Sequence, residues 1–144
     1  MRVLVQRSGA SSVSVDSKTI GSIESGLVLL VGFTDGDDIT NIEYLAKKVV
    51  NLRIFDDENG VMNKSILEVG GSILSISQFT LYADTKKGNR PSYVAAMRGE
   101  ESTKLYDLFN DELRKYVDVE TGKFGADMTV NITNNGPVTI LLEK

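Results

Sequence analysis

Cysteine and histidine do not occur in this chain of 144 residues, and each absence removes a class of chemistry. Without cysteine, disulfide bonds and thiolate nucleophiles are both excluded. Without histidine, the chain lacks the usual general base near pH 7, the usual zinc ligand and every Ser–His nucleophile pair. If the protein is an enzyme, it must use backbone groups, hydroxyls, amides, carboxylates, lysines or a reactive substrate.

Long hydrophobic runs and a strong net charge are also lacking. No apolar run approaches the roughly 20 residues that a membrane-spanning helix needs, and residues 1–7 resemble a first strand rather than a signal peptide. We therefore expect a cytoplasmic protein without a membrane partner. Lys and Arg number 16 against 20 Asp and Glu, which gives a net charge of −4. This balance argues against a protein that coats long DNA or RNA, but it permits a short contact with one end of an RNA.

The remaining composition is ordinary for a globular protein, with 41% hydrophobic and 25% charged residues. The length predicts a single domain over residues 1–144, without repeats or linkers. Two acidic clusters, at 56–58 and 100–101, are explained as a solvated turn and as a helix start that the helix dipole favours. The first lacks the ligand spacing of a calcium loop, so we expect neither a metal nor a cofactor.

The hydrophobic pattern predicts several strands and two helices. Apolar and polar residues alternate in some segments, one continuous apolar run is typical of a strand buried on both faces, and two segments have helical spacing. Strands are predicted at 2–7, 13–20, 26–32 and 72–81, and helices at about 38–52 and 99–117. Because strands and helices do not alternate strictly, we predict a mainly antiparallel α+β domain, a β-barrel with helices packed outside.

The strand predicted over 72–81 ends in hydroxyl and amide side chains beside a polar loop. Alternation along a strand would place Gln78 and Thr80 on one face, where they could hydrogen-bond a ligand over the strand end. A simpler explanation is that the strand leaves the core here and its side chains meet solvent. If the stretch is functional, Thr80 is a nucleophile or, with Gln78, a positioning group. A threonine nucleophile needs a nearby base, and no histidine exists to supply one.

Three cations lie within five residues on the loop that follows this strand. Lys86, Lys87 and Arg90 flank Gly88 and Asn89. Contact with nucleic-acid phosphates is the functional interpretation. A solvated charged loop is the alternative, and it is the more common one for so short a run.

The segment 134–139 joins two runs that both resemble strands, 128–133 and 138–142. Asn135 and Gly136 together are typical of a tight hairpin turn, because both residues tolerate positive φ. Pro137 follows directly and has no N–H to give to a strand ladder, so an ordinary two-residue hairpin cannot close. A glycine before proline also permits a cis bond, but only about 5–6% of X–Pro bonds in folded proteins are cis. The residues alone therefore favour a wide turn with a trans proline.

Taken together, these motifs resemble the D-aminoacyl-tRNA deacylase family, enzymes that cleave D-amino acids from mischarged tRNA. The resemblance covers essentially the whole chain. Its two signature motifs are 77–81 and 134–139, found in order and about the usual distance apart. The segments 86–92 and 124–128, which lie between the two signatures, also carry the resemblance, and weaker support comes from 21–27 and 62–65. The chain departs from the commoner family pattern at Asn135, where an aspartate is usual, and around Arg7, whose role stays open.

The resemblance implies a homodimer in which the loop at Gly136 and Pro137 of one subunit enters the active site of the other. In the family this glycine–proline bond is cis. The main chain of the loop would form a barrier that collides with an L side chain and lets a D side chain point out of the pocket. Glycine has no side chain to exclude, so glycyl-tRNA mischarged on tRNA-Ala is an expected second substrate. An alanine at Gly136 would crowd the substrate.

The resemblance also suits the missing histidine, because an aminoacyl ester on a ribose is already activated. The neighbouring 2′-hydroxyl of the tRNA would assist hydrolysis, and backbone amides of Phe79 and Thr80 would stabilise the oxyanion. Ser77 and Gln78 complete the implied catalytic set, with Gln78 fixing the ribose or ester. The cations at 86, 87 and 90 are the expected phosphate contacts for the 3′ end of the tRNA. The alternatives are a non-catalytic tRNA-end binding module related to synthetase editing domains and a structural barrel dimer without a ligand.

Overall fold

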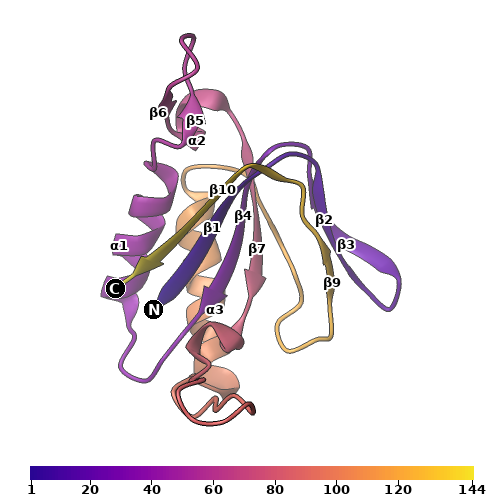
Figure 1. Ribbon diagram of the computed structural model, residues 1–144, viewed down its shortest axis with the longest axis vertical. Helices are drawn as coiled ribbons and strands as arrows, with labels where there is room; N and C mark the ends of the chain where they lie inside the picture. Colours follow the sequence, from indigo (N-terminus) through magenta and orange to yellow (C-terminus); the bar gives the residue numbers. More distant parts are fainter.

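The computed structural model describes residues 1–144, and its largest element is a five-stranded mixed sheet (Figure 1). The strand order is β10-β1-β4-β7-β8. The first strand pairs antiparallel with both β10 and β4, whereas β4–β7 and β7–β8 are parallel. The bounds are β1 Arg2–Ser8, β4 Gly26–Gly32, β7 Ser72–Ser77, β8 Val119–Thr121 and β10 Asn134–Glu143.

A smaller sheet of three strands lies beside the first, and a short hairpin projects from one end of the molecule. The smaller sheet has the order β3-β2-β9, with both of its ladders antiparallel. Its strands are β2 Ser11–Val15, β3 Lys18–Ile23 and β9 Thr129–Asn131, and the hairpin consists of β5 Phe55–Asp56 and β6 Met62–Lys64.

Two amphipathic helices cover one face of the five-stranded sheet (Figure 1). Helix α1 (Ile39–Val50) begins at Asp38, whose side chain accepts a hydrogen bond from the Thr40 amide and forms a capping box with Asn41. This agrees with the strong preference for aspartate at helix N-caps. Helix α3 (Gly99–Arg114) contributes the other covering layer. Both predicted helices are confirmed, and a single-turn helix α2 (Ile66–Val69) and a 3₁₀ turn η1 (Phe79–Tyr82) were not predicted.

Two hydrophobic cores lie on opposite faces of the five-stranded sheet. The larger core fills the space between the sheet and the helices, and the smaller one lies under β2, β3 and β9. Strand β4 contributes to both, because Leu27, Leu29 and Val31 belong to the larger core and Val28 to the smaller. The prediction that residues 26–32 are buried on both faces is therefore confirmed.

The α+β class and the antiparallel majority are confirmed, but the expected closed barrel is wrong. The two larger sheets share no ladder, and β3 and β8 lie across a cavity of about 640 Å³. At Gly21 the approach is close, since a Cβ built there would be 3.0 Å from the carbonyl oxygen of Thr121. Strand β8 has only three residues, and acidic side chains of Glu24 and Glu120 line the gap. An edge this short and charged does not pair onward.

The helices are all too short or too polar to span a membrane.

The remaining corrections to the predicted fold concern the two signature motifs. The strand predicted over 72–81 ends at Ser77, and β10 begins at Asn134 and runs through the motif. The segment 134–139 is consequently part of one strand and not a turn between two.

Candidate active site

The first signature motif begins where β7 loses its partner strand. The amide of Gln78 donates to the carbonyl oxygen of Val31 at 2.7 Å, and β4 ends one residue later at Gly32. With no neighbour left to pair, the chain folds into η1, where the amide of Leu81 donates to the carbonyl of Gln78 at 3.4 Å. The first amides of such a turn have no acceptor inside it. The amides of Phe79 and Thr80 are in this position.

The side chains of Gln78 and Thr80 are in contact, as predicted, but strand alternation is not the cause. The strand has already ended, so the expected two-residue period does not apply to 79–81. Instead the 3₁₀ turn brings the Gln78 side-chain amide within 2.5 Å of the Thr80 hydroxyl oxygen. The amide donates and the hydroxyl oxygen accepts. A donor in this place cannot remove the hydroxyl proton, so Gln78 is not a general base for Thr80.

Two adjoining cavities open beside this turn. One of about 70 Å³ lies against the strand end, and the other, of about 370 Å³, lies further out. The side chains of Phe79 and Phe124 line both of them. Phe79 is 51% exposed although it is a large aromatic residue, and its ring packs edge-on against Tyr93 with centroids 5.2 Å apart. An exposed aromatic pair beside a mainly apolar cavity is suited to flat ligands such as nucleobases.

Arg2 holds the 3₁₀ turn in place, a role that no sequence pattern predicts. Its guanidinium donates to the carbonyl oxygen of Leu81 at 2.8 Å and lies 4.5 Å from the centre of the Tyr82 ring. A third contact is an ion pair with Glu143 at 2.7 Å. Burial raises the pKa of Tyr82 to about 12, with the nearby Asp37 acting in the same direction and Arg2 in the opposite one. The phenol therefore stays neutral near pH 7.

The three predicted phosphate contacts lie on the loop that follows η1, and none of them lines either cavity. Lys86, Lys87 and Arg90 are all exposed, and none of them takes part in an ion pair. The loop is closed by backbone hydrogen bonds between Asp84 and Ser92. These cations are therefore free to contact a ligand anion, but they share no bond with Gln78 or Thr80.

The second signature motif is fixed by a network of side chains at the far end of β1. The Gly136–Pro137 peptide bond is cis, as the resemblance implies and contrary to the trans turn that the residues alone favour. The Asn134 side-chain amide donates to the carbonyl oxygen of Val138, beyond the bend, and to that of Arg7 on the neighbouring strand β1. Arg7 donates in turn to both oxygens of Asn135, at 3.4 and 3.3 Å.

Arg7 thus has a role that the sequence left open. Besides Asn135 it binds the carbonyl oxygen of Ile54 at 2.9 Å and the carboxylate of Asp56 at 3.1 Å. Its side chain is only 12% exposed. Through these contacts Arg7 joins the motif to the β5–β6 hairpin. A methyl group on Gly136 would lie 2.9 Å from the Val138 nitrogen of the same chain, so the expected crowding by alanine begins inside the protomer.

Within one chain the two motifs lie at opposite ends of the five-stranded sheet (Figure 1). Gly26 is opposite Ser72 at the end near Arg7, and Val31 is opposite Ser77 at the end near Gln78. Five residues of strand at about 3.3 Å each separate these ends by roughly 17 Å. The structure therefore does not bring Gly136 and Pro137 together with Ser77–Thr80 of the same chain.

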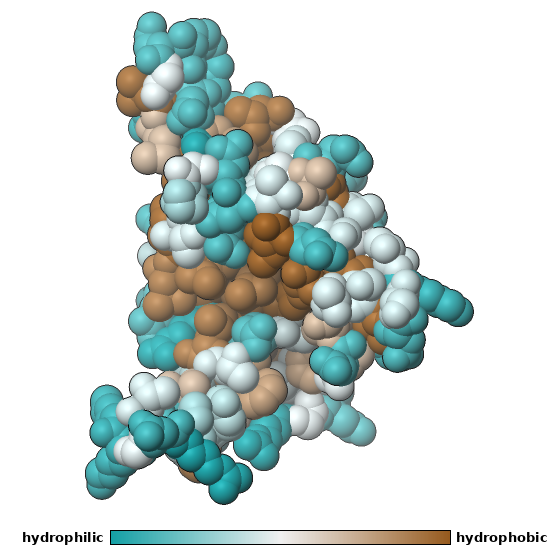
Figure 2. Space-filling model, turned by 45° about the vertical axis from the view of Figure 1, so that its right-hand side comes forward, coloured by the Kyte–Doolittle hydropathy of each residue, from teal (hydrophilic) through white to brown (hydrophobic).

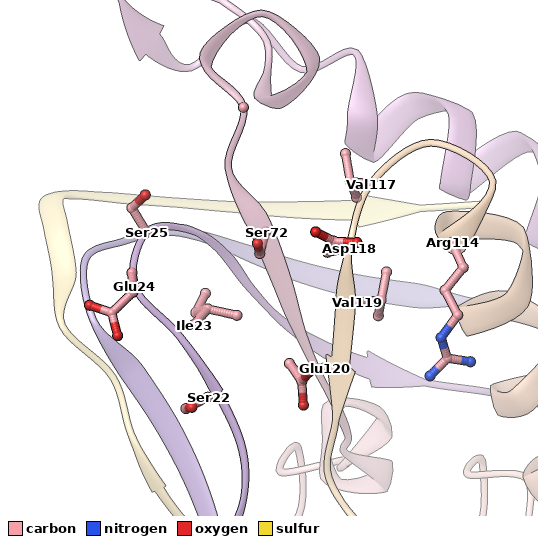
Figure 3. Close-up of a pocket in the computed structure, with 11 residues that line it drawn as sticks. Ser22, Ile23, Glu24, Ser25, Ser72, Arg114, Val117, Asp118, Val119 and Glu120 are labelled. Atoms are coloured by element: carbon pink, nitrogen blue, oxygen red, sulfur yellow. The ribbon is translucent and has the colours of Figure 1, made fainter.

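The largest cavity contains none of the predicted site residues. It is the gap between β3 and β8, and Figure 3 shows Glu24, Asp118 and Glu120 around it, with Arg114 at one side. Its lining includes part of the segment 21–27 that supported the resemblance. The structure has no group of three or more Asp or Glu side chains arranged to hold a metal ion. We therefore place the candidate active site at the smaller cavities beside η1.

Comparisons with known proteins give one consistent family. A family model described as D-Tyr-tRNA(Tyr) deacylase matches residues 4–143. A protein named D-aminoacyl-tRNA deacylase from Clostridium novyi is 55% identical over 145 residues, covering 100% of this chain and 97% of the relative. Another with the same name from Bacillus cytotoxicus is 54% identical, covering 100% of this chain and 99% of that protein.

Solved structures agree with this fold. One described as c-Myc DNA Unwinding Element Binding Protein superposes with a TM-score of 0.94 at 40% identity, covering 100% of this chain and 99% of the other. One described as a probable eukaryotic D-amino acid tRNA deacylase has a TM-score of 0.84, covering 98% of this chain and 97% of the other. At 19% identity, the second shows likeness of fold alone.

Proposed function

The chain belongs to the D-Tyr-tRNA(Tyr) deacylase family, and from that premise we propose how its geometry selects and hydrolyses a D-aminoacyl-tRNA. The activity is that of a D-aminoacyl-tRNA deacylase, an ester hydrolase acting on charged tRNA. The observation that supports the mechanism most strongly is the placement of the two motifs. Each is held rigidly, and within one chain they lie too far apart to act on one substrate.

Two copies of the chain would bring the motifs together. Leu4 is opposite Leu141 on one side and Leu30 on the other, so the three side chains share the sheet face that the helices do not cover. Leu141 is 50% exposed, and Figure 2 shows hydrophobic residues across the middle of the molecule. An exposed apolar area of this kind favours association. We therefore propose a homodimer in which the Gly136–Pro137 loop of each subunit enters the active site of the other.

In such a dimer the loop acts as a main-chain barrier. Asn134 and Arg7 hold it from both sides, so it cannot yield to a side chain that collides with it. An L-aminoacyl group would direct its side chain into the barrier, and a D-aminoacyl group would direct it away. Backbone alone does not distinguish one side chain from another, so many D-amino acids are accepted. Glycine has no side chain to collide, and glycyl-tRNA mischarged on tRNA-Ala is a second substrate.

Hydrolysis itself requires little of the protein, because the aminoacyl ester is activated and the 2′-hydroxyl of the terminal ribose lies beside it. The free amides of Phe79 and Thr80 would stabilise the oxyanion that forms at the ester carbonyl. Ser77 and Gln78 would position the ribose and ester in the inner cavity. The hydrogen bond from Gln78 to the Thr80 hydroxyl argues against Thr80 as the nucleophile, because it supplies a donor where a base is needed.

The cation loop would hold the phosphates of the single-stranded 3′ end. Lys86, Lys87 and Arg90 form no ion pair and lie on the exposed loop that follows η1. Phe79 and Tyr93, on either side of this loop in the sequence, line the outer cavity and offer aromatic surface to a base. A small number of phosphate contacts is compatible with a net charge of −4. The alternative function is a tRNA-end binding module without catalysis, which the same features would support.

Hydrolysis of D-Tyr-tRNA and L-Tyr-tRNA by the purified protein separates these functions. We expect release of D-tyrosine and no acceleration of L-tyrosine release above the buffer rate. Binding of both without turnover would establish the binding module instead. Equal rates on both substrates would refute the main-chain barrier while leaving the hydrolase. Glycyl-tRNA should be cleaved in the same assay.

A further inference from the structure

A buried hydrogen-bonded contact links helix α3 to the strand that ends in the candidate active site. The carbonyl oxygen of Ser75, two residues before Ser77, accepts a hydrogen bond from the Tyr106 hydroxyl at 2.7 Å. The same oxygen accepts the amide of Gly122 at 3.0 Å. One carbonyl therefore joins β7, α3 and the turn that leads to Phe124. Ser75 and Tyr106 are both almost completely buried, so no water replaces these bonds.

The Tyr106 ring makes a second contact with the site. It packs against Phe124 with the ring centroids 5.7 Å apart. Phe124 lines both cavities beside η1. Burial raises the pKa of Tyr106. The hydroxyl keeps its proton at neutral pH and remains a donor to Ser75.

The polar character of this contact is costly to the fold. The Ser75 hydroxyl and the side-chain oxygen of Asn110, both buried, have no hydrogen-bond partner. Helix α1 packs against the same sheet face through Ile42, Leu45 and Val49, all apolar. Buried polar groups without partners each cost about 1–3 kcal/mol, so stability alone would favour an apolar contact at α3 as well. The hydrogen bond from Tyr106 adds a directional constraint. It fixes the position of β7 along the strand axis, which apolar packing alone does not do.

We propose that Tyr106 is a positioning residue for the deacylase reaction, whose hydroxyl fixes the end of β7 and whose ring supports Phe124. This rests on the proposed function. The hydroxyl sets the position of Gln78 and of the amides at Phe79 and Thr80, three to five residues beyond Ser75. The ring sets the aromatic surface that both cavities share. The Tyr106 hydroxyl thus positions the groups around the reacting ester, and the Tyr106 ring positions the surface that contacts the bound nucleotide.

Two substitutions separate the two parts. Tyr106→Phe keeps the ring and removes only the hydroxyl, so we expect kcat on D-Tyr-tRNA to fall about tenfold with KM within twofold of wild type. A tenfold change corresponds to a loss of about 1.4 kcal/mol of transition-state stabilisation. Tyr106→Leu removes the ring as well, and KM should then rise at least fivefold in addition. Backbone amide resonances of Gln78–Thr80 should shift in both variants.

Two controls exclude a general effect of tyrosine loss or of destabilisation. Tyr116→Phe makes the same deletion at a tyrosine that is 44% exposed and forms no side-chain hydrogen bond, and its kcat should equal that of wild type. Val49→Ala weakens the buried face of α1 away from the site, and it should lower the melting temperature without moving the amide resonances of 78–80. All assays are made at a temperature at which circular dichroism shows every variant folded.

The inference and the proposed function fail in different ways. Wild-type kcat in Tyr106→Phe, unshifted amide resonances at 78–80, or an equal fall of kcat in Val49→Ala would each overturn the positioning role. A wild-type protein that does not cleave D-Tyr-tRNA would overturn the proposed function. The resonance shifts would still report whether Tyr106 fixes the end of β7, because they are measured without substrate.

Discussion

A subunit-mixing experiment tests the central geometric claim, that each active site is built from two chains. One variant, Gln78→Ala, damages the strand end and leaves the loop intact. The other, Gly136→Ala, damages the loop and leaves the strand end intact, because its methyl group would lie 2.8 Å from the Val138 side chain and 2.9 Å from the Val138 nitrogen. Each homodimer then has two defective sites.

The expected magnitude follows from the structure. The two motifs lie roughly 17 Å apart along one sheet, at about 3.3 Å per residue, so no chain can complete its own site. In a symmetric dimer, random exchange makes about half of the dimers mixed, each with one intact site of two. Mixing equal amounts should therefore restore about a quarter of the wild-type rate.

The assay is release of D-tyrosine from D-Tyr-tRNA after the two variants are unfolded together and refolded. Gel filtration shows that dimers have formed, and circular dichroism shows that each variant folds. Mixed samples no more active than the separate variants, with dimers present, would refute the cross-subunit site. Should Gly136→Ala fail to fold, Asn134→Ala is the substitute, because it removes the hydrogen bond across the bend to Val138 and the one that ties the bend to Arg7 on β1.

Three further predictions concern single features of the site. Thr80→Ala should retain more than about a tenth of wild-type kcat. Removing one oxyanion donor lowers kcat by roughly 10²–10³, and removing a covalent nucleophile lowers it by far more. A loss of that size in Thr80→Ala would restore Thr80 as the nucleophile. Arg2→Ala should lower the free energy of unfolding by about 1–2 kcal/mol and reduce kcat/KM, because η1 loses the hydrogen bond to the Leu81 carbonyl and the contact with Tyr82. Chemical denaturation measures the first effect and steady-state kinetics the second. Unchanged kinetics would show that η1 holds its position without Arg2. Replacing Lys86, Lys87 and Arg90 by glutamine should raise KM and reduce the salt dependence of log KM by about 0.7 per lost phosphate contact on single-stranded RNA; an unchanged salt dependence would place the tRNA elsewhere.

Much of the fold could be predicted from local pattern. The helix over 39–50 followed from apolar spacing and an aspartate cap, and the strand over 26–32 from an uninterrupted apolar run. This helix and this strand both form from residues that are close together in the sequence, so their pattern can be read without the tertiary structure. The end of β7 could not be predicted in this way. Residues 78–81 continue the strand pattern, and the strand ends only because its partner β4 ends at Gly32.

The candidate site shows the same division. The two signature motifs were found from the chain, since Ser77–Leu81 and the Asn–Gly–Pro segment match family patterns by residue type and order. The side chains that hold them were found only in part. Arg2 and Tyr106 have ordinary neighbours in sequence, whereas Arg7 was named without a role and Phe124 only as part of the segment 124–128. Their contacts join residues that are far apart along the chain, as Arg2 does with Leu81 and Arg7 with Asn135.

The sequence by itself determined what chemistry is excluded, that of thiolate and imidazole, and left backbone groups, hydroxyls, amides, carboxylates, lysines or a reactive substrate. It also determined which residues bend the chain at Gly136 and Pro137. Only the tertiary structure decided where these groups lie, with the two motifs at opposite ends of one sheet and the sheets left open between β3 and β8. The physical reason is that residue types fix local conformation and reactivity, whereas pairing between distant strands fixes position.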